Sequence, residues 1–191
     1  MQAIEFAQEP IRRLRRVEYE QLAALGVFDD ERVELLEGVI TGMSPQGPEH
    51  QWSIVTATEY LIRLLAGRAQ VRAQLPLGVA EDSEPEPDFA IVIPTVGLTG
   101  TPTAALLVIE VSDSTVRRDR DIKAALYARA SVPEYWLIDV PRRVLEVRTR
   151  PAGGSYTRLE TFEREAKVRP VSFPDLEFDL AFFIPPPRAA S

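Results

Sequence analysis

"LLVIEVSDSTVRRDRDIKAALYARA", residues 106–130, places a short apolar run directly before a segment with helical periodicity. The run ALLVIEVS at 105–112 has the length of a strand and is almost continuously apolar, which predicts burial on both faces. Ser114 is expected to cap a helix that extends to about Ala130. A buried strand followed by a helix that crosses back over it predicts an α/β sandwich around a mixed sheet.

The rest of the chain alternates between helical and extended patterns. We expect helices over 17–27 and 50–67, extended segments over 32–43, 70–80, 87–93 and 134–140, and a hairpin over 143–163 closed by PAGG. Within 32–43, Gly38 and Gly42 are expected to be bulges or turns. A length of 191 residues predicts a single domain. We divide it into an N-terminal helical and strand arm (about 1–43), a core (about 44–140) and a C-terminal β meander (about 141–184).

The composition restricts the classes of function. A net charge of -7 argues against a protein that coats nucleic acid through bulk positive charge, although a local basic patch remains compatible with nucleic-acid binding. The absence of cysteine excludes disulfides and thiolate metal sites. No run of 18 apolar residues occurs, and the N-terminus lacks a signal-peptide pattern. We therefore expect a soluble cytoplasmic protein with no membrane association.

Two acidic residues stand at the ends of apolar strands. Glu110 follows LLVI, and Asp88 precedes the second extended run directly after Pro87. If the strands are neighbours, the two carboxylates would repel each other unless a cation or a proton were shared. Oxygen ligands without histidine or cysteine favour Mg²⁺ or Mn²⁺. The alternative is that Asp88 only forms a turn and that Glu110 pairs with a nearby arginine.

Lys123 is unusual in a chain that has 22 basic residues, of which only two are lysines. A lysine ammonium is a compact point charge, whereas the arginine guanidinium is a planar fork. We expect Ile122, Leu126 and Ala130 to form the apolar stripe of the helix, with Lys123 beside it and its stem directed inward. The alternative is a surface pair of Asp119 with Lys123, worth about 0.3–0.5 kcal/mol.

Three segments carry a resemblance to a known family: PD at 87–88, IEVSDST at 109–115 and RRDRDIKAALYARASVPEYWLID at 117–139. They resemble the Uma-two family of restriction-endonuclease-like proteins, in the PD-(D/E)xK nuclease superfamily. The resemblance runs from about Val33 to about Asp179. It implies an α/β fold with a restriction-endonuclease-like core, in which a mixed β-sheet is flanked by helices, with extra antiparallel C-terminal strands.

The resemblance also implies a metal site. Asp88 and Glu110, helped by the Val111 carbonyl, would bind the divalent metal. The superfamily pattern places a lysine two residues after the glutamate, and here that position is Ser112. Related chains carry the lysine on the following helix, so Lys123 looks like the relocated catalytic lysine.

Other site residues are implied with open alternatives. His50 stands where relatives often have a histidine, and it would orient water or assist the metal, or else only cap a loop. Tyr127 resembles a recurrent family tyrosine that either touches the site or packs in the core. Many relatives carry an acid at the position of Val39, so this departure leaves Glu34 and Glu37 without an assigned role.

The function expected from these residues is metal-dependent hydrolysis of nucleic-acid phosphodiester bonds, with DNA as the expected substrate and a homodimer as the expected assembly. Arg117, Arg118 and Arg120 would clamp the flanking phosphates, unless they only form a solvated helix face. A non-catalytic module of the same fold that binds nucleic acid or protein remains an alternative. A carboxylate-pair hydrolase acting on sugars is a third possibility, which gives Lys123 no role.

Overall fold

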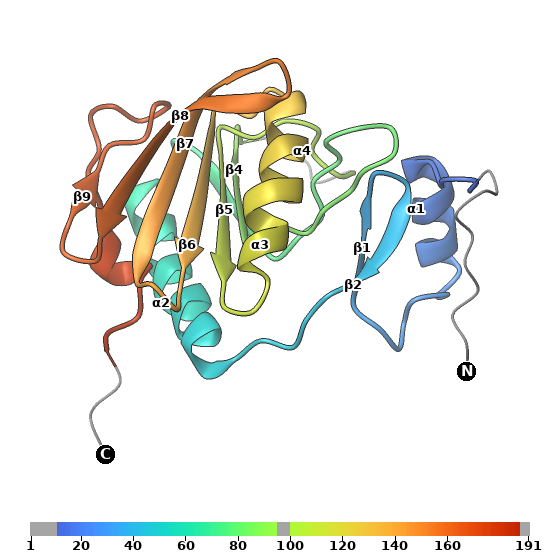
Figure 1. Ribbon diagram of the computed structural model, residues 1–191, viewed down its shortest axis with the longest axis horizontal. Helices are drawn as coiled ribbons and strands as arrows, with labels where there is room; N and C mark the ends of the chain where they lie inside the picture. Colours follow the sequence, from blue (N-terminus) through green and yellow to red (C-terminus); the bar gives the residue numbers. More distant parts are fainter. Residues whose placement is uncertain (1–10, 95–99, 188–191) are drawn as a thin grey trace.

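A six-stranded mixed sheet forms the centre of the computed structural model, which describes residues 11–94 and 100–187 (Figure 1). The first ten residues of the expected N-terminal arm therefore lie outside the described residues. The strand order is β3-β4-β5-β6-β7-β8, and β5 and β6 are its parallel pair. The strands are β3 (Gln70–Ala73), β4 (Phe89–Val92), β5 (Leu107–Ser112), β6 (Glu134–Asp139), β7 (Val144–Ala152) and β8 (Ser155–Glu163).

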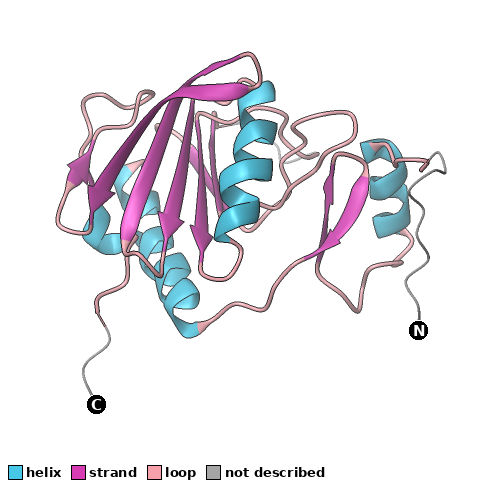
Figure 2. Ribbon diagram, viewed as in Figure 1, coloured by secondary structure: helices cyan, strands magenta, loops and turns pink. Residues whose placement is uncertain are grey.

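Helices cover both faces of this sheet (Figure 2). One face packs against α2 (Pro48–Leu64), which contributes Ala57 and Leu61 to the larger core cluster. The other face packs against a helix that connects β5 to β6 and contributes Ala124 and Tyr127 to a second cluster. This helix has three parts, α3 (Val116–Arg118), a π-helical turn η1 (Asp119–Lys123) and α4 (Ala124–Arg129).

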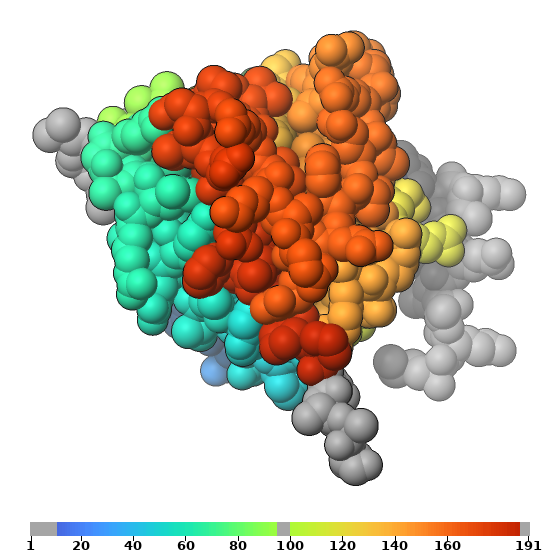
Figure 3. All heavy atoms as spheres, turned by 90° about the vertical axis from the view of Figure 1, so that its left-hand side faces the viewer, coloured from blue at the N-terminus to red at the C-terminus, as the bar shows by residue number. Residues whose placement is uncertain are grey.

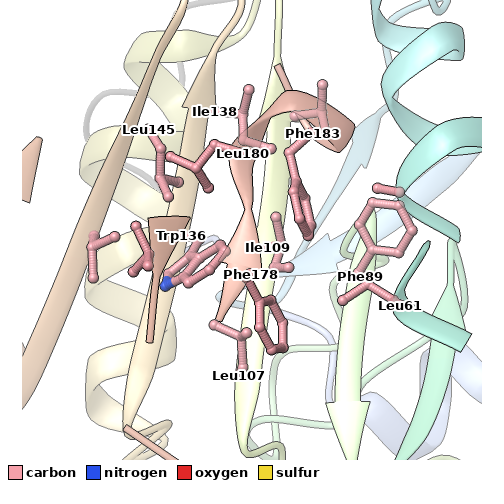
Figure 4. Close-up of a cluster of buried hydrophobic side chains, with 14 of the residues drawn as sticks. Leu61, Phe89, Leu107, Ile109, Trp136, Ile138, Leu145, Phe178, Leu180 and Phe183 are labelled. Carbon is pink, nitrogen blue, oxygen red and sulfur yellow. The ribbon is translucent and has the colours of Figure 1, made fainter. Parts of the chain in front are cut away.

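The C-terminal segment completes the larger core. It contains β9 (Lys167–Val168), β10 (Phe178–Asp179) and the 3₁₀ turn η2 (Leu180–Phe182). Phe178 and Phe183 are fully buried and lie edge-on to Trp136, with ring centroids 5.6 and 5.8 Å from it (Figure 4). In the space-filling view this segment, in red, lies between the α2 side of the molecule and the orange β7–β8 hairpin (Figure 3).

An N-terminal unit packs beside the sheet, consisting of α1 (Arg16–Ala24), β1 (Val33–Leu36) and β2 (Val39–Gly42). The two-residue turn between β1 and β2 has positive φ at both Glu37 (49°) and Gly38 (75°), the conformation of a type I′ hairpin turn. Leu35 and Glu84 exchange backbone hydrogen bonds of 3.3 and 2.8 Å, which tie β1 to the segment before β4. All four β1 residues are consequently buried.

The predicted fold class is confirmed. The turn expected at Gly38 within the extended segment 32–43 is also confirmed, and the segment is a hairpin in which Glu37 and Gly38 form the turn. One local expectation is corrected. Ile122, expected on the apolar stripe, is 46% exposed, whereas Lys123 is only 2% exposed. The π-helical turn changes the angular spacing of the side chains, so Lys123 and Tyr127 face the sheet instead. Within the described ranges, no helix has the length and apolar character needed to cross a membrane.

Candidate active site

Asp88 and Glu110 lie side by side on two neighbouring interior strands of the sheet, Asp88 directly before β4 and Glu110 within β5. Phe89 of β4 pairs with Ile109 of β5 in antiparallel register, so Asp88 and Glu110 occupy the next positions outward along their strands. The two acids are 8% and 3% exposed. The Val111 amide donates a 2.8 Å hydrogen bond to Asp88 Oδ2, which fixes this carboxylate against β5.

Lys123 reaches Glu110 from the helix that crosses the sheet. Its Nζ lies 3.0 Å from Glu110 Oε1 and 3.1 Å from Glu34 Oε2. The Tyr127 hydroxyl donates a 2.8 Å hydrogen bond to the same Glu110 oxygen. The pair of Asp119 with Lys123 on the surface, considered from the sequence, is therefore not what forms. Lys123 is instead a buried ammonium held between two buried carboxylates.

The pKa values of Glu110 and Lys123 follow from their burial and from the charged groups around them. Burial raises the pKa of Glu110 to about 8; Lys123 opposes this rise, and the charges of neighbouring carboxylates add to it. Burial alone would lower the pKa of Lys123, but the carboxylates, led by Glu110 and Glu34, outweigh it and raise that pKa above its ordinary value. The proton therefore stays on Lys123, and Glu110 binds a proton more readily than an exposed glutamate does, chiefly because it is buried.

His50 lies in the first turn of α2 and contacts Asp88. Its Nε2 is 3.1 Å from Asp88 Oδ1 and 3.2 Å from Oδ2. Gln74 Nε2 donates a longer bond of 3.4 Å to Asp88 Oδ1. His50 is thus directed at a site carboxylate, and its imidazole restricts the orientation of that carboxylate.

A small cavity of about 60 Å³ opens onto Asp88, Glu110 and Lys123. One wall is the segment 43–47, which leads from β2 into α2, and another is the start of the helix after β5. Arg118, whose side chain is 23% exposed, lines the cavity, and its Nη1 donates to the Gly42 carbonyl at 3.4 Å. The cavity is too small for a nucleotide but has room for an ion or a water molecule.

The three arginines predicted to bind phosphates lie in different environments. The Arg117 side chain is 98% exposed, and its Nε lies 4.0 Å from Asp121 Oδ2. Arg118 lines the cavity. Arg120 faces away, because its Nη2 is 2.8 Å from both Asp139 Oδ2 and Glu146 Oε1. This last contact is a structural ion pair at the edge of β6 and β7.

The structure also places residues at or beside the cavity that the sequence analysis did not assign to the site. Asp119 is 3% exposed, lines the cavity, and accepts a 2.8 Å hydrogen bond from Ser112, the residue at the vacant lysine position. Arg32 lines the cavity as well and lies 3.6 Å from Glu86. Glu34 was left without a role. A charged residue inside the otherwise apolar strand VELL was the available signal for Glu34.

The donor set fits a divalent cation. Asp88, Glu110 and Asp119 are buried carboxyl groups that line the cavity, and Glu34 is a fourth beside it. In the part of the chain that the structure describes, no three His, Cys, Asp or Glu side chains group closely enough to hold an ion unaided. Mg²⁺ usually takes only one or two protein carboxylates and completes its shell with water and substrate phosphate.

Comparison with known proteins agrees with this description. A model of the Uma2 family, described as "Putative restriction endonuclease", matches residues 16–181. The fold is similar to the crystal structure of "a putative nuclease belonging to DUF820" from Anabaena variabilis, with a TM-score of 0.65 and 21% sequence identity over 81% of this chain and 90% of that chain. No curated protein sequence matches the chain. Because the family model spans most of its length, the chain belongs to the Uma2 family.

Proposed function

We propose that the chain is a metal-dependent nuclease that hydrolyses phosphodiester bonds in nucleic acid, with DNA as its substrate. The observation that carries this proposal is the meeting of two buried carboxylates, Asp88 and Glu110, with one buried ammonium, Lys123, at a single cavity. Membership of the Uma2 family supports the same reaction class. Residues that only stabilised the fold would not need three buried charges at a solvent opening.

Asp88 and Glu110 are the residues that would hold Mg²⁺ or Mn²⁺, with the Val111 carbonyl as a further oxygen ligand. Such an ion, when bound, polarises a phosphoryl oxygen and lowers the pKa of a bound water. Tyr127 orients the Glu110 carboxylate by donating to Oε1, and His50 orients Asp88. These second contacts keep the two acids aligned toward the cavity.

Lys123 has the role of orienting the attacking water or of offsetting negative charge that develops on the phosphate. Arg118 at the cavity wall and Arg117 beyond it would contact the neighbouring phosphates of the strand. Arg120 is left out of this role because Asp139 and Glu146 already satisfy its guanidinium.

The test is cleavage of supercoiled plasmid and of labelled oligonucleotides, in DNA and RNA form, with Mg²⁺, Mn²⁺ or EDTA. We expect cleavage that needs the metal and that falls by about 10²-fold or more in Asp88→Asn and in Glu110→Gln. Asp175→Asn, at an exposed position paired with Arg68, is the control and should cleave normally. Calorimetric titration with Mn²⁺ separates the alternatives, since a non-catalytic binding module would show neither cleavage nor a site that depends on Asp88 and Glu110.

A further inference from the structure

We propose that Glu34 is a positioning residue that holds the Lys123 ammonium in place, so that the N-terminal hairpin forms part of the candidate active site. This inference rests on the proposed function, because it concerns Lys123, whose positive charge takes part in catalysis in that proposal. It assigns a role to a strand outside the central sheet.

The contacts of Glu34 place it between the two cations of the cavity. Its side chain is fully buried, and its Oε2 lies 3.1 Å from Lys123 Nζ. The same oxygen accepts a 3.2 Å hydrogen bond from the Glu86 amide. Its other oxygen, Oε1, is 3.7 Å from Arg118 Nη2. One carboxylate therefore contacts two of the positive groups that line the opening, Lys123 and Arg118.

A packing role alone does not explain a glutamate at this position. Every other residue of β1 is an apolar side chain in the interior, including Leu35, which is fully buried. Burying a carboxylate has a desolvation penalty of several kcal/mol that only well-placed partners offset. Glu34 Oε1 has no hydrogen bond among the described residues although it is buried. An apolar side chain at this position of β1 would avoid the desolvation penalty, so the charge of Glu34 is best explained by its ion pair with Lys123.

The geometry of the ammonium shows what Glu34 contributes. A lysine Nζ carries three N–H donors. One of them is donated to Glu110 Oε1 at 3.0 Å, and Glu34 Oε2 lies 3.1 Å from the same Nζ as an ion pair. Two carboxylates on two different strands therefore fix the position of the ammonium, and Lys123 lines the cavity. Without Glu34 the ammonium would be held by Glu110 alone and would rotate about that single contact.

Glu34→Gln tests this proposal, because the amide keeps the size of the side chain and can still accept the bond from the Glu86 amide. A purely structural Glu34 would, on this change, lower the free energy of unfolding but leave kcat of the folded enzyme unchanged. A positioning Glu34 would not, and we expect kcat for DNA cleavage to fall about tenfold to a hundredfold while KM stays within about twofold, as for loss of one charged contact of the ammonium.

A second readout needs no catalysis. The chain has only two lysines, and Lys167 is exposed, so it serves as an internal reference for acetylation followed by mass spectrometry. In the parent protein Lys123 should acetylate far more slowly than Lys167. In Glu34→Gln the ratio of the Lys123 rate to the Lys167 rate should rise about tenfold, because the ammonium loses one of its two carboxylates.

The matched control is Glu84→Gln, which changes another buried glutamate beside the same hairpin, at a position that does not line the cavity. It should leave kcat and the acetylation ratio unchanged. If Glu34→Gln fails to fold, Glu34→Asp keeps the charge but withdraws it by one methylene, and it should lower kcat with KM preserved. Parental kcat and parental Lys123 acetylation in whichever Glu34 variant folds would overturn the proposal. If the parent protein cleaves nothing, the proposed nuclease function fails, and the acetylation ratio still decides the role of Glu34.

Discussion

At the residue scale, Lys123 is a buried charge and not a helix-surface charge. Its ammonium is enclosed by Glu110 and Glu34, so its size matters as well as its sign. The near-exclusive use of arginine elsewhere in the chain is consistent with this, because a planar guanidinium does not fit where a compact donor meets two carboxylates.

Lys123→Arg should lower the rate of DNA cleavage roughly 10²-fold or more, comparable to the loss of one preorganised donor. The larger side chain also overfills a closed site, so the free energy of unfolding should fall by about 1–3 kcal/mol. Cleavage assays and urea unfolding measure the two effects separately. Lys167→Arg, at the exposed lysine, should change neither quantity, and a Lys123→Arg protein that cleaves at the parental rate would exclude the relocated-lysine mechanism.

Glu84 predicts a pH dependence of stability. Burial, with a contribution from Glu20, raises its pKa from 4.5 to about 7 in the folded protein. The folded state therefore holds this proton more tightly than the unfolded state does. The stability that this gives is complete below about pH 4.5 and is lost as the pH rises toward 7. Urea unfolding at pH 5 and pH 8 should show a smaller loss of stability in Glu84→Gln than in the parent. Identical pH profiles for the two proteins would contradict the assignment.

At the element scale, the C-terminal segment is a structural part of the core. Phe178 and Phe183 fill the space beside Trp136, and Tyr60 of α2 fixes the segment by accepting from the Asp179 amide at 2.9 Å and donating to the Glu177 carbonyl at 3.1 Å. The sheet face under α2 is thus closed by residues far away in the sequence.

Phe178→Ala should lower the free energy of unfolding by about 3–5 kcal/mol, because a fully buried ring leaves a cavity in contact with Trp136. Thermal and urea unfolding give this value. Phe182→Ala removes a ring of the same size at a position that is 39% exposed, so its effect should be clearly smaller. Equal losses in the two variants would show that the segment does not contribute through burial.

The elements of the sheet could be predicted from local sequence, whereas part of the site could not. The apolar runs predicted β4, β5 and β6, and PAGG predicted the turn between β7 and β8, since each of these signals lies within a short stretch of sequence. The π-helical turn leaves no such signal, because it arises where Asp119 and Lys123 both gain buried partners. The contact of Glu34 with Lys123 joins two segments whose meeting depends on how the hairpin docks, so the pattern of either segment alone does not predict it.

At the scale of the whole molecule, the N-terminal unit is joined to the rest of the chain by backbone hydrogen bonds and by an ion pair. The hydrogen bonds between Leu35 and Glu84 and the ion pair of Glu34 with Lys123 cross the boundary between them. We propose on this ground that the chain folds as one domain. Far-UV circular dichroism and the fluorescence of Trp52 and Trp136 should then report a single, coincident unfolding transition. A separate early transition would show that the N-terminal unit folds independently.

Homodimer formation remains a proposal at this scale. The sheet ends in two edge strands, β3 and β8, and an enzyme that cuts both strands of a duplex needs two sites related by a twofold axis. Light scattering at high protein concentration should give twice the mass of the chain, and a mass of one chain would count against duplex cutting by a preformed dimer.

The π-helical turn has a consequence for how relatives of this chain are recognised. An α-helix turns about 100° per residue, so one residue inserted or removed between Asp119 and Lys123 would reorient the two side chains by about that angle relative to each other. A relative that reaches the same cavity with an unbroken α-helix must therefore carry its lysine one alignment column away from Lys123. An ungapped alignment would classify such a protein as lacking the lysine, even though its ammonium occupied the same place in space.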